Sequence, residues 1–116
     1  MFEVEMVNGV PEVKAENFQK FTGPVRLIDV RRAEEFNGEL GHIEKAQLIT
    51  LGPDLQNFLE EGAAGNLKDQ TIVFVCRSGG RSAQATMFSQ QLGYTKVYNL
   101  QGGMLNWNSL QLPIHK

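Results

Sequence analysis

The segment best suited to chemistry contains the only cysteine of the chain. It combines a nucleophile with small, polar and cationic residues: Cys76, Arg77, Ser78, Gly79, Gly80, Arg81 and Ser82. The segment follows an apolar run and precedes apolar residues at helical spacing, so it joins a strand to a helix. Backbone N–H groups at the start of a helix bind anions, and two glycines let successive N–H groups turn inward. These groups and the two arginines favour a thiolate, so we expect a lowered pKa for Cys76 and an anionic substrate.

The length of this loop bears on the chemistry. Cys76 and Arg81 enclose four residues, whereas cysteine phosphatases and many arsenate reductases place five residues between the two. A cradle that is one residue shorter fits a tetrahedral oxyanion less well and suits a single sulfur atom added to the thiol. A phosphatase or an arsenate reductase stays as an alternative function, and a plain turn with solvated arginines as the structural alternative.

Four other side chains invite a functional interpretation. Asp29 and Arg31 follow the first buried strand near the same sheet edge, and we expect them to pair with one another and brace the loop. His42 is expected to hold a turn by hydrogen bonds rather than to act as a general base. Trp107 is expected to pack in the core.

Composition excludes several classes of protein. One cysteine among 116 residues rules out an internal disulfide, a tetrathiolate zinc site and a dithiol redox pair. A net charge of −2 argues against nucleic acid as a partner. No apolar run has membrane-spanning length, so we expect a cytoplasmic protein without a membrane partner. No binding motif for a metal or an organic cofactor is visible.

The apolar patterns alternate between strands and helices along what we read as one domain, residues 1–116. Four runs are typical of strands: Val25–Val30, Ala46–Ile49, Thr71–Val75 and Lys96–Leu100. Helical stripes are formed by Phe18 and Phe21, by Leu51, Leu55, Phe58 and Leu59 up to Gly62, and by Ala85, Phe88 and Leu92 up to Gly93. Residues 1–9, where Phe2, Val4 and Met6 alternate with acids, are an extension or a hairpin that turns at Asn8-Gly9 into residues 10–13. This alternation predicts an α/β fold with helices on both faces of an open sheet.

Several motifs beyond the loop resemble the rhodanese family. They are Leu27-Ile28-Asp29-Val30-Arg31, Glu34-Glu35-Phe36, Gly41-His42-Ile43 with Ala46, Gly102-Gly103 with Trp107, and Leu112-Pro113. They occur in the family's order over about residues 25–113, which is more specific than any single motif. One position departs from the pattern: Lys45 stands where the family usually has glycine.

The resemblance implies a five-stranded, mainly parallel sheet with helices on both faces. It also implies a thiosulfate sulfurtransferase without a cofactor, in which Cys76 takes sulfur from a small anionic donor and holds it as a persulfide. The acceptor would be cyanide in an assay, or a cellular thiol or protein cysteine. A sulfur carrier or interaction module that serves one dedicated partner remains an alternative.

Overall fold

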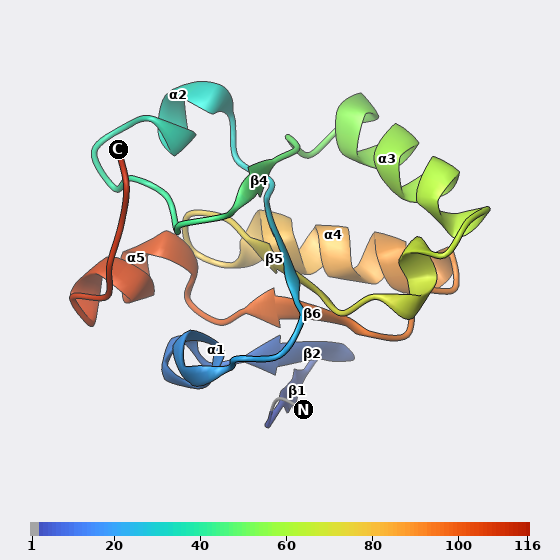
Figure 1. The fold of residues 1–116 in the computed structure, drawn as a ribbon, viewed down its shortest axis with the longest axis horizontal. Coiled ribbons are helices and arrows are strands. Elements are labelled where there is room, and N and C mark those ends of the chain that lie inside the picture. The colour runs from blue at the N-terminus through green and yellow to red at the C-terminus, as the bar shows by residue number, and fades with distance from the viewer. Residues whose placement is uncertain (1–2) are drawn as a thin grey trace.

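Six strands form one sheet in the computed structural model, which describes residues 3–116 (Figure 1). The strands are β1 (Glu5–Val7), β2 (Val10–Val13), β3 (Arg26–Asp29), β4 (Gln47–Leu48), β5 (Ile72–Val75) and β6 (Val97–Leu100). Their order across the sheet is β1-β2-β6-β5-β3-β4. Every neighbouring pair is parallel except β1 and β2. The carboxyl ends of β2 to β6 therefore meet at one edge, where ligands bind in sheets of this kind.

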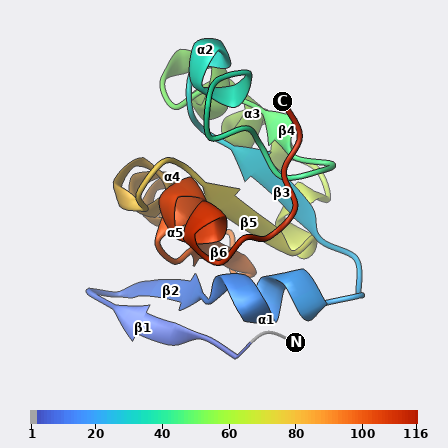
Figure 2. The same cartoon turned by 90° about the vertical axis from the view of Figure 1, so that its left-hand side faces the viewer.

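The prediction of a mainly parallel α/β sheet is confirmed, but the number of five strands is one too low. The sixth strand is β1, which pairs antiparallel with β2 at the edge of the sheet (Figure 2). Asn8 and Gly9 both have positive φ, 52° and 82°, as a tight hairpin turn requires. The motifs behind the resemblance begin beyond this segment, so they gave no sign of the extra strand. Phe2 lies outside the described residues.

Helices cover both faces of the sheet, as predicted. They are α1 (Ala15–Lys20), α2 (Ala33–Phe36), α3 (Pro53–Ala63), α4 (Gly80–Gln91) and α5 (Gly103–Ser109), with a 3-10 turn, η1, over Leu67–Asp69. Residues of α3 and α4 pack with one face of the sheet, and residues of α1 and α5, including Trp107, pack with the other. None of the helices in residues 3–116 is long and apolar enough to cross a membrane.

The helix boundaries follow local backbone signals. Pro53 opens α3, at a position where its missing N–H has no helical partner to lose. The predicted stop at Gly62 is nearly right, since α3 runs through Gly62 and ends at Ala63. Gly93, with φ of 96°, follows α4 in the left-handed conformation that the sequence predicted. Phe18 lies in α1, but Phe21, predicted to belong to the same helical stripe, lies just past the end of this helix.

Candidate active site

Cys76 lies directly after β5, at the carboxyl edge of the sheet, and is 1% exposed. Its Sγ accepts hydrogen bonds from the backbone N–H of Gly79, 3.1 Å away, and from the hydroxyl of Ser82, 3.3 Å away. Gly79 has φ of 112°, a conformation that side chains rarely adopt, and it is the N-cap of α4. The glycine thus lets the chain curl around the sulfur before the helix begins.

The environment of the sulfur lowers the pKa of Cys76. Burial raises the pKa of the thiol, but hydrogen bonds from Ser82, Gly79 and Ser78 together lower it by more, so it lies below its ordinary value. The direction is the one the sequence predicted. The cause differs in part from the one predicted. The lowering of the pKa comes chiefly from the hydroxyl and N–H donors of the loop, whereas the prediction from the sequence included the arginines as well.

The N-terminus of α5 holds the backbone of the same loop. The N–H groups of Met104 and Leu105 donate to the carbonyl oxygens of Cys76 and Arg77, each at 2.9 Å. Gly103 makes this approach feasible, because a Cβ on it would lie 2.5 Å from the carbonyl oxygen of Cys76. Sequence reasoning noted Gly103 only as part of a family motif and missed this role.

The two loop arginines lie in different surroundings. Arg81 donates from both terminal nitrogens to the carboxylate of Glu35 in α2, each at 2.8 Å. The hydrogen bond from Arg81 lowers the pKa of Glu35 to about 2. Arg77 is exposed, and its guanidinium has no ion pair or hydrogen bond within residues 3–116. Arg81 therefore ties the loop to α2, while Arg77 faces solvent.

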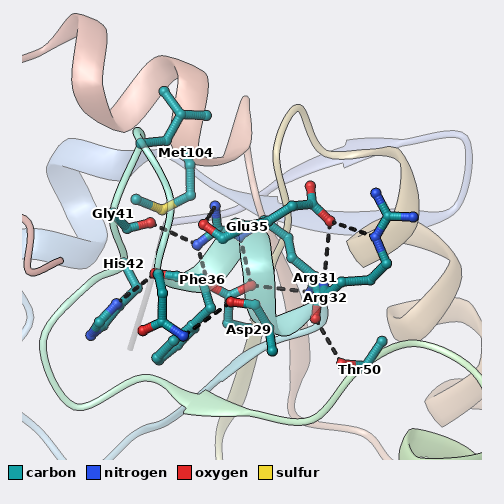
Figure 3. Close-up of polar contacts among 12 residues, drawn as sticks. Asp29, Arg31, Arg32, Glu35, Phe36, Gly41, His42, Thr50 and Met104 are labelled. Atoms are coloured by element: carbon teal, nitrogen blue, oxygen red, sulfur yellow. Dashed lines mark hydrogen bonds and ion pairs between the residues drawn. The ribbon is translucent and has the colours of Figure 1, made fainter.

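Asp29 and Arg31 form the pair that the sequence predicted (Figure 3). Arg31 Nε and Nη2 donate to the two carboxylate oxygens of Asp29 at 2.9 and 2.7 Å, and both side chains are buried. Arg31 also donates to the carbonyl oxygens of Glu35 and Gly41. The pair thus fixes the segment around α2, and it reaches the cysteine loop through the bond between Glu35 and Arg81.

His42 has the structural contacts expected of it. Its Nδ1 lies 2.8 Å from the carbonyl oxygen of Phe36, and its ring stacks on the Phe36 ring at 3.8 Å (Figure 3). Its backbone exchanges two hydrogen bonds with His115, which anchors the C-terminal segment.

A buried asparagine escaped the sequence reasoning. Asn99 Oδ1 accepts a 2.5 Å hydrogen bond from Ser82, and Asn99 Nδ2 donates to Glu12 and to the carbonyl oxygen of Gly79. A signal was present, because a polar residue interrupts the apolar run of β6 at a position that should be buried.

A hollow of about 370 Å³ lies beside the loop, between the α2 segment and Arg77. Its lining mixes cations and carboxylates: Arg31, Glu34, Glu35, Gly38, Glu39, Leu40 and Arg77. A larger hollow, of about 670 Å³, lies at the amino ends of the strands and is lined by none of the loop residues. The cysteine loop, α2 and Asn99 thus form the candidate site at the opposite edge of the sheet.

Comparisons with known proteins agree with this geometry. The chain is 49% identical over 47 residues to a sulfurtransferase of Allochromatium vinosum; the match covers 40% of this chain and 44% of that protein, less than half its length. It is 30% identical to the human thiosulfate:glutathione sulfurtransferase, over 85% of this chain and 94% of that one. The rhodanese-like domain protein of Staphylococcus aureus has a similar structure, with a TM-score of 0.68 and 26% identity, over 90% of this chain and 98% of that one.

The model of the rhodanese-like domain family matches residues 13–110, which extends the resemblance seen in the sequence toward the N-terminus. The sulfurtransferases among the relatives support sulfur transfer in general. The chain therefore belongs to the rhodanese-like domain family.

Proposed function

We propose that the chain is a sulfurtransferase in which Cys76 carries a sulfane sulfur as a persulfide. The observation that carries the proposal is the pair of donors to Sγ, the N–H of Gly79 and the hydroxyl of Ser82, which stabilises a thiolate without a general base. The same donors can cradle a sulfur atom added to the thiol. The relatives named as sulfurtransferases support the reaction class.

The loading step uses a donor such as thiosulfate. The Cys76 thiolate attacks the outer sulfur of the donor, a new S–S bond forms, and the old S–S bond breaks with its electron pair leaving on sulfite. Sulfite is a competent leaving group, so the step needs no acid. Arg77, whose guanidinium is unpaired within residues 3–116, is placed to attract the sulfonate of the donor.

The second step passes the outer sulfur to a thiophilic acceptor. An acceptor thiolate forms a bond to that sulfur, the bond to Sγ breaks, and its electron pair returns to Cys76 as the thiolate. The human relative is named for glutathione as its partner, which favours a small thiol as the acceptor here; cyanide would serve in an assay. A cytoplasmic location and a single domain remain predictions.

The pairing of Arg81 argues against the phosphatase and arsenate reductase alternatives. In those enzymes the arginine of the loop must bind the oxyanion held at the cysteine, yet both terminal nitrogens of Arg81 bind Glu35. The alternative of a carrier that serves one dedicated partner shares the persulfide and differs in the acceptor.

Steady-state kinetics with thiosulfate and glutathione as varied substrates test the proposal. A persulfide relay gives parallel double-reciprocal lines, because sulfite leaves before the acceptor binds. Intersecting lines would contradict a covalent relay. A protein that takes up sulfur from thiosulfate but turns over with neither glutathione nor cyanide would be a dedicated carrier.

A further inference from the structure

Behind Cys76 lies a buried hydroxyl with two competing acceptors. The Ser82 Oγ is 3.3 Å from Cys76 Sγ and 2.5 Å from Asn99 Oδ1. All three residues are at most 1% exposed. A serine hydroxyl has one proton to donate, so it serves one of the two acceptors at a time.

The amide of Asn99 is held in one orientation. Its Nδ2 donates to the carboxylate of Glu12 at 2.9 Å and to the carbonyl oxygen of Gly79 at 3.1 Å. Both of these groups can only accept, so a flipped amide would set oxygen against oxygen. Asn99 therefore presents its carbonyl oxygen to Ser82.

A third acceptor near the hydroxyl competes poorly. The carbonyl oxygen of Gly79 lies 3.3 Å from Ser82 Oγ, which is long for a hydroxyl donor. It already accepts from Asn99 Nδ2 and from the backbone N–H of Ala83. The choice of the hydroxyl is thus between Asn99 Oδ1 and Cys76 Sγ.

We propose that Asn99 is a positioning residue that competes with Cys76 for the hydrogen bond donated by the Ser82 hydroxyl. Asn99 Oδ1 accepts this hydrogen bond while Sγ is uncharged, and the hydroxyl donates to Sγ instead when negative charge develops there. The uncharged Sγ of the thiol or of the persulfide is a weak hydrogen-bond acceptor, so in both states the Ser82 hydroxyl donates to Asn99 Oδ1. A thiolate is a charged and stronger acceptor, so the hydroxyl rotates toward it. The rotation leaves the buried oxygen of Asn99 without its partner, which limits how far the thiolate is stabilised.

The inference rests on the proposed sulfur transfer and describes its second step. When an acceptor thiolate bonds to the outer sulfur, the electron pair of the breaking bond moves to Sγ. At that moment the Ser82 hydroxyl rotates, donates its hydrogen bond to Sγ and stabilises the departing thiolate. Because a more stable thiolate leaves faster and attacks more slowly, Asn99 sets the balance between discharge and loading.

Charged groups lie on the elements packed around Cys76, and Arg81 interacts with it electrostatically. They are Glu12 on β2, Asp29 at the end of β3, Arg31 after it, Glu35 on α2, Arg77 of the loop and Arg81 on α4. Asn99→Leu keeps all of these charges but also removes the hydrogen bonds from Nδ2 to Glu12 and Gly79. Comparing its effect in the wild type with its effect in the Ser82→Ala background therefore isolates the hydrogen bond from Ser82.

Three variants test the proposal by the pH dependence of Cys76 alkylation with iodoacetamide, measured on unloaded protein. Ser82→Ala removes a donor, so the midpoint should move to higher pH. Asn99→Leu removes the competing acceptor, so the midpoint should move to lower pH and the alkylation rate below the wild-type midpoint should rise several-fold. The double variant should match Ser82→Ala, because Asn99 acts through the hydroxyl. Ser89→Ala, which removes another buried hydroxyl of α4, bonded to Ala85, is the matched control and should leave the midpoint unchanged.

If Ser82 and Asn99 only supported the structure of the loop, both variants should shift the alkylation midpoint in the same direction. Opposite shifts therefore indicate competition for the hydroxyl. The proposal is overturned if Asn99→Leu raises the midpoint or leaves it unchanged. It is overturned equally if Asn99→Leu lowers the midpoint as much in the Ser82→Ala background as in the wild type.

A measurement on the wild type decides the matter if Asn99→Leu does not fold. The side-chain amide signals of Asn99 in ¹H–¹⁵N spectra should move with the midpoint of Cys76, and this movement should be lost in Ser82→Ala. The exposed amide of Asn37, bonded to Ala33, is the internal reference. Signals of Asn99 that stay still through the titration, or that move equally in both proteins, would refute the shared proton. All these readouts use the unloaded thiol, so a failure of sulfur loading would show itself separately.

Discussion

Arg77 and Arg81 have the same side chain but different contacts, and we expect them to have different roles. Arg81 is bonded through both terminal nitrogens to Glu35, whereas the guanidinium of Arg77 is unpaired within residues 3–116 and borders the hollow beside the loop. Arg77→Ala should therefore raise the KM for thiosulfate by roughly tenfold with little change in kcat, since one ionic hydrogen-bonding contact is lost. Arg77→Lys should restore part of the loss, because an ammonium cannot offer two parallel hydrogen bonds.

Arg81→Ala serves as the contrasting variant in the same kinetics. It should lower thermal stability and kcat together, because the loop loses its tie to α2. If Arg77→Ala had wild-type kinetics, Arg77 would be an ordinary surface residue.

The ion pair between Glu35 of α2 and Arg81 predicts how the stability of the fold depends on pH. Glu35 has its pKa lowered from 4.5 to about 2 by the hydrogen bond from Arg81. A lowered carboxyl pKa stabilises the fold fully above pH 4.5, and this contribution is lost as the pH falls toward 2. Glu35→Gln should cost about 1 kcal/mol at neutral pH, a modest figure because Arg81 is partly exposed to solvent.

Urea unfolding of both proteins from neutral pH downward measures this contribution. The difference between wild type and Glu35→Gln should shrink as the pH falls below 4.5. A difference that is constant over the whole range would show that the charge of Glu35 contributes nothing to stability.

The turn before β4 carries strain that the sequence indicated. Lys45 has φ of 70°, the left-handed conformation for which glycine is suited, and glycine is what the family usually has there. Lys45→Gly should raise stability by about 1 kcal/mol or slightly less, because relief of the backbone strain outweighs the greater chain entropy of glycine. Thermal unfolding would measure it as a rise in Tm. Lys45→Ala keeps the strained φ and should give no rise, and an equal gain in both variants would assign the effect to the lysine side chain.

Local patterns predicted most of the elements but not how the elements meet. The apolar run at Thr71–Val75, the Asn8-Gly9 turn and the glycine at the end of α4 each depend on nearby residues, and the structure has them as β5, the hairpin turn and the end of α4. Cys76 and its loop were found because a nucleophile, glycines and arginines are contiguous.

The partners of the loop were missed because they are far away in the sequence. Glu35 reaches Arg81 across 46 positions, and Asn99 reaches Ser82 across 17. No local pattern encodes such pairings. Sequence reasoning assigned Arg77 and Arg81 the same interpretation for this reason, since the carboxylate partner of Arg81 comes from another element.

Burial of the one cysteine governs how the whole molecule handles sulfur. Cys76 is 1% exposed and no second thiol exists in the chain, so a persulfide has no internal cysteine with which to form a disulfide. The loaded protein should keep its sulfur for hours without an acceptor, lose it within minutes on addition of glutathione, and form little covalent dimer. Intact mass followed over time with and without glutathione measures all three. Spontaneous loss of sulfur together with disulfide-linked dimer would identify Cys76 as an oxidation-prone thiol instead.

The covalent intermediate itself is the central claim, and intact mass spectrometry after incubation with thiosulfate tests it most directly. The chain should gain the mass of one sulfur atom, and peptide mapping should locate that atom on Cys76. Cys76→Ser, with an unaltered circular dichroism spectrum, should gain nothing and should have no thiosulfate:cyanide activity. Turnover by the wild type without a mass gain, or activity retained by Cys76→Ser, would contradict the persulfide mechanism.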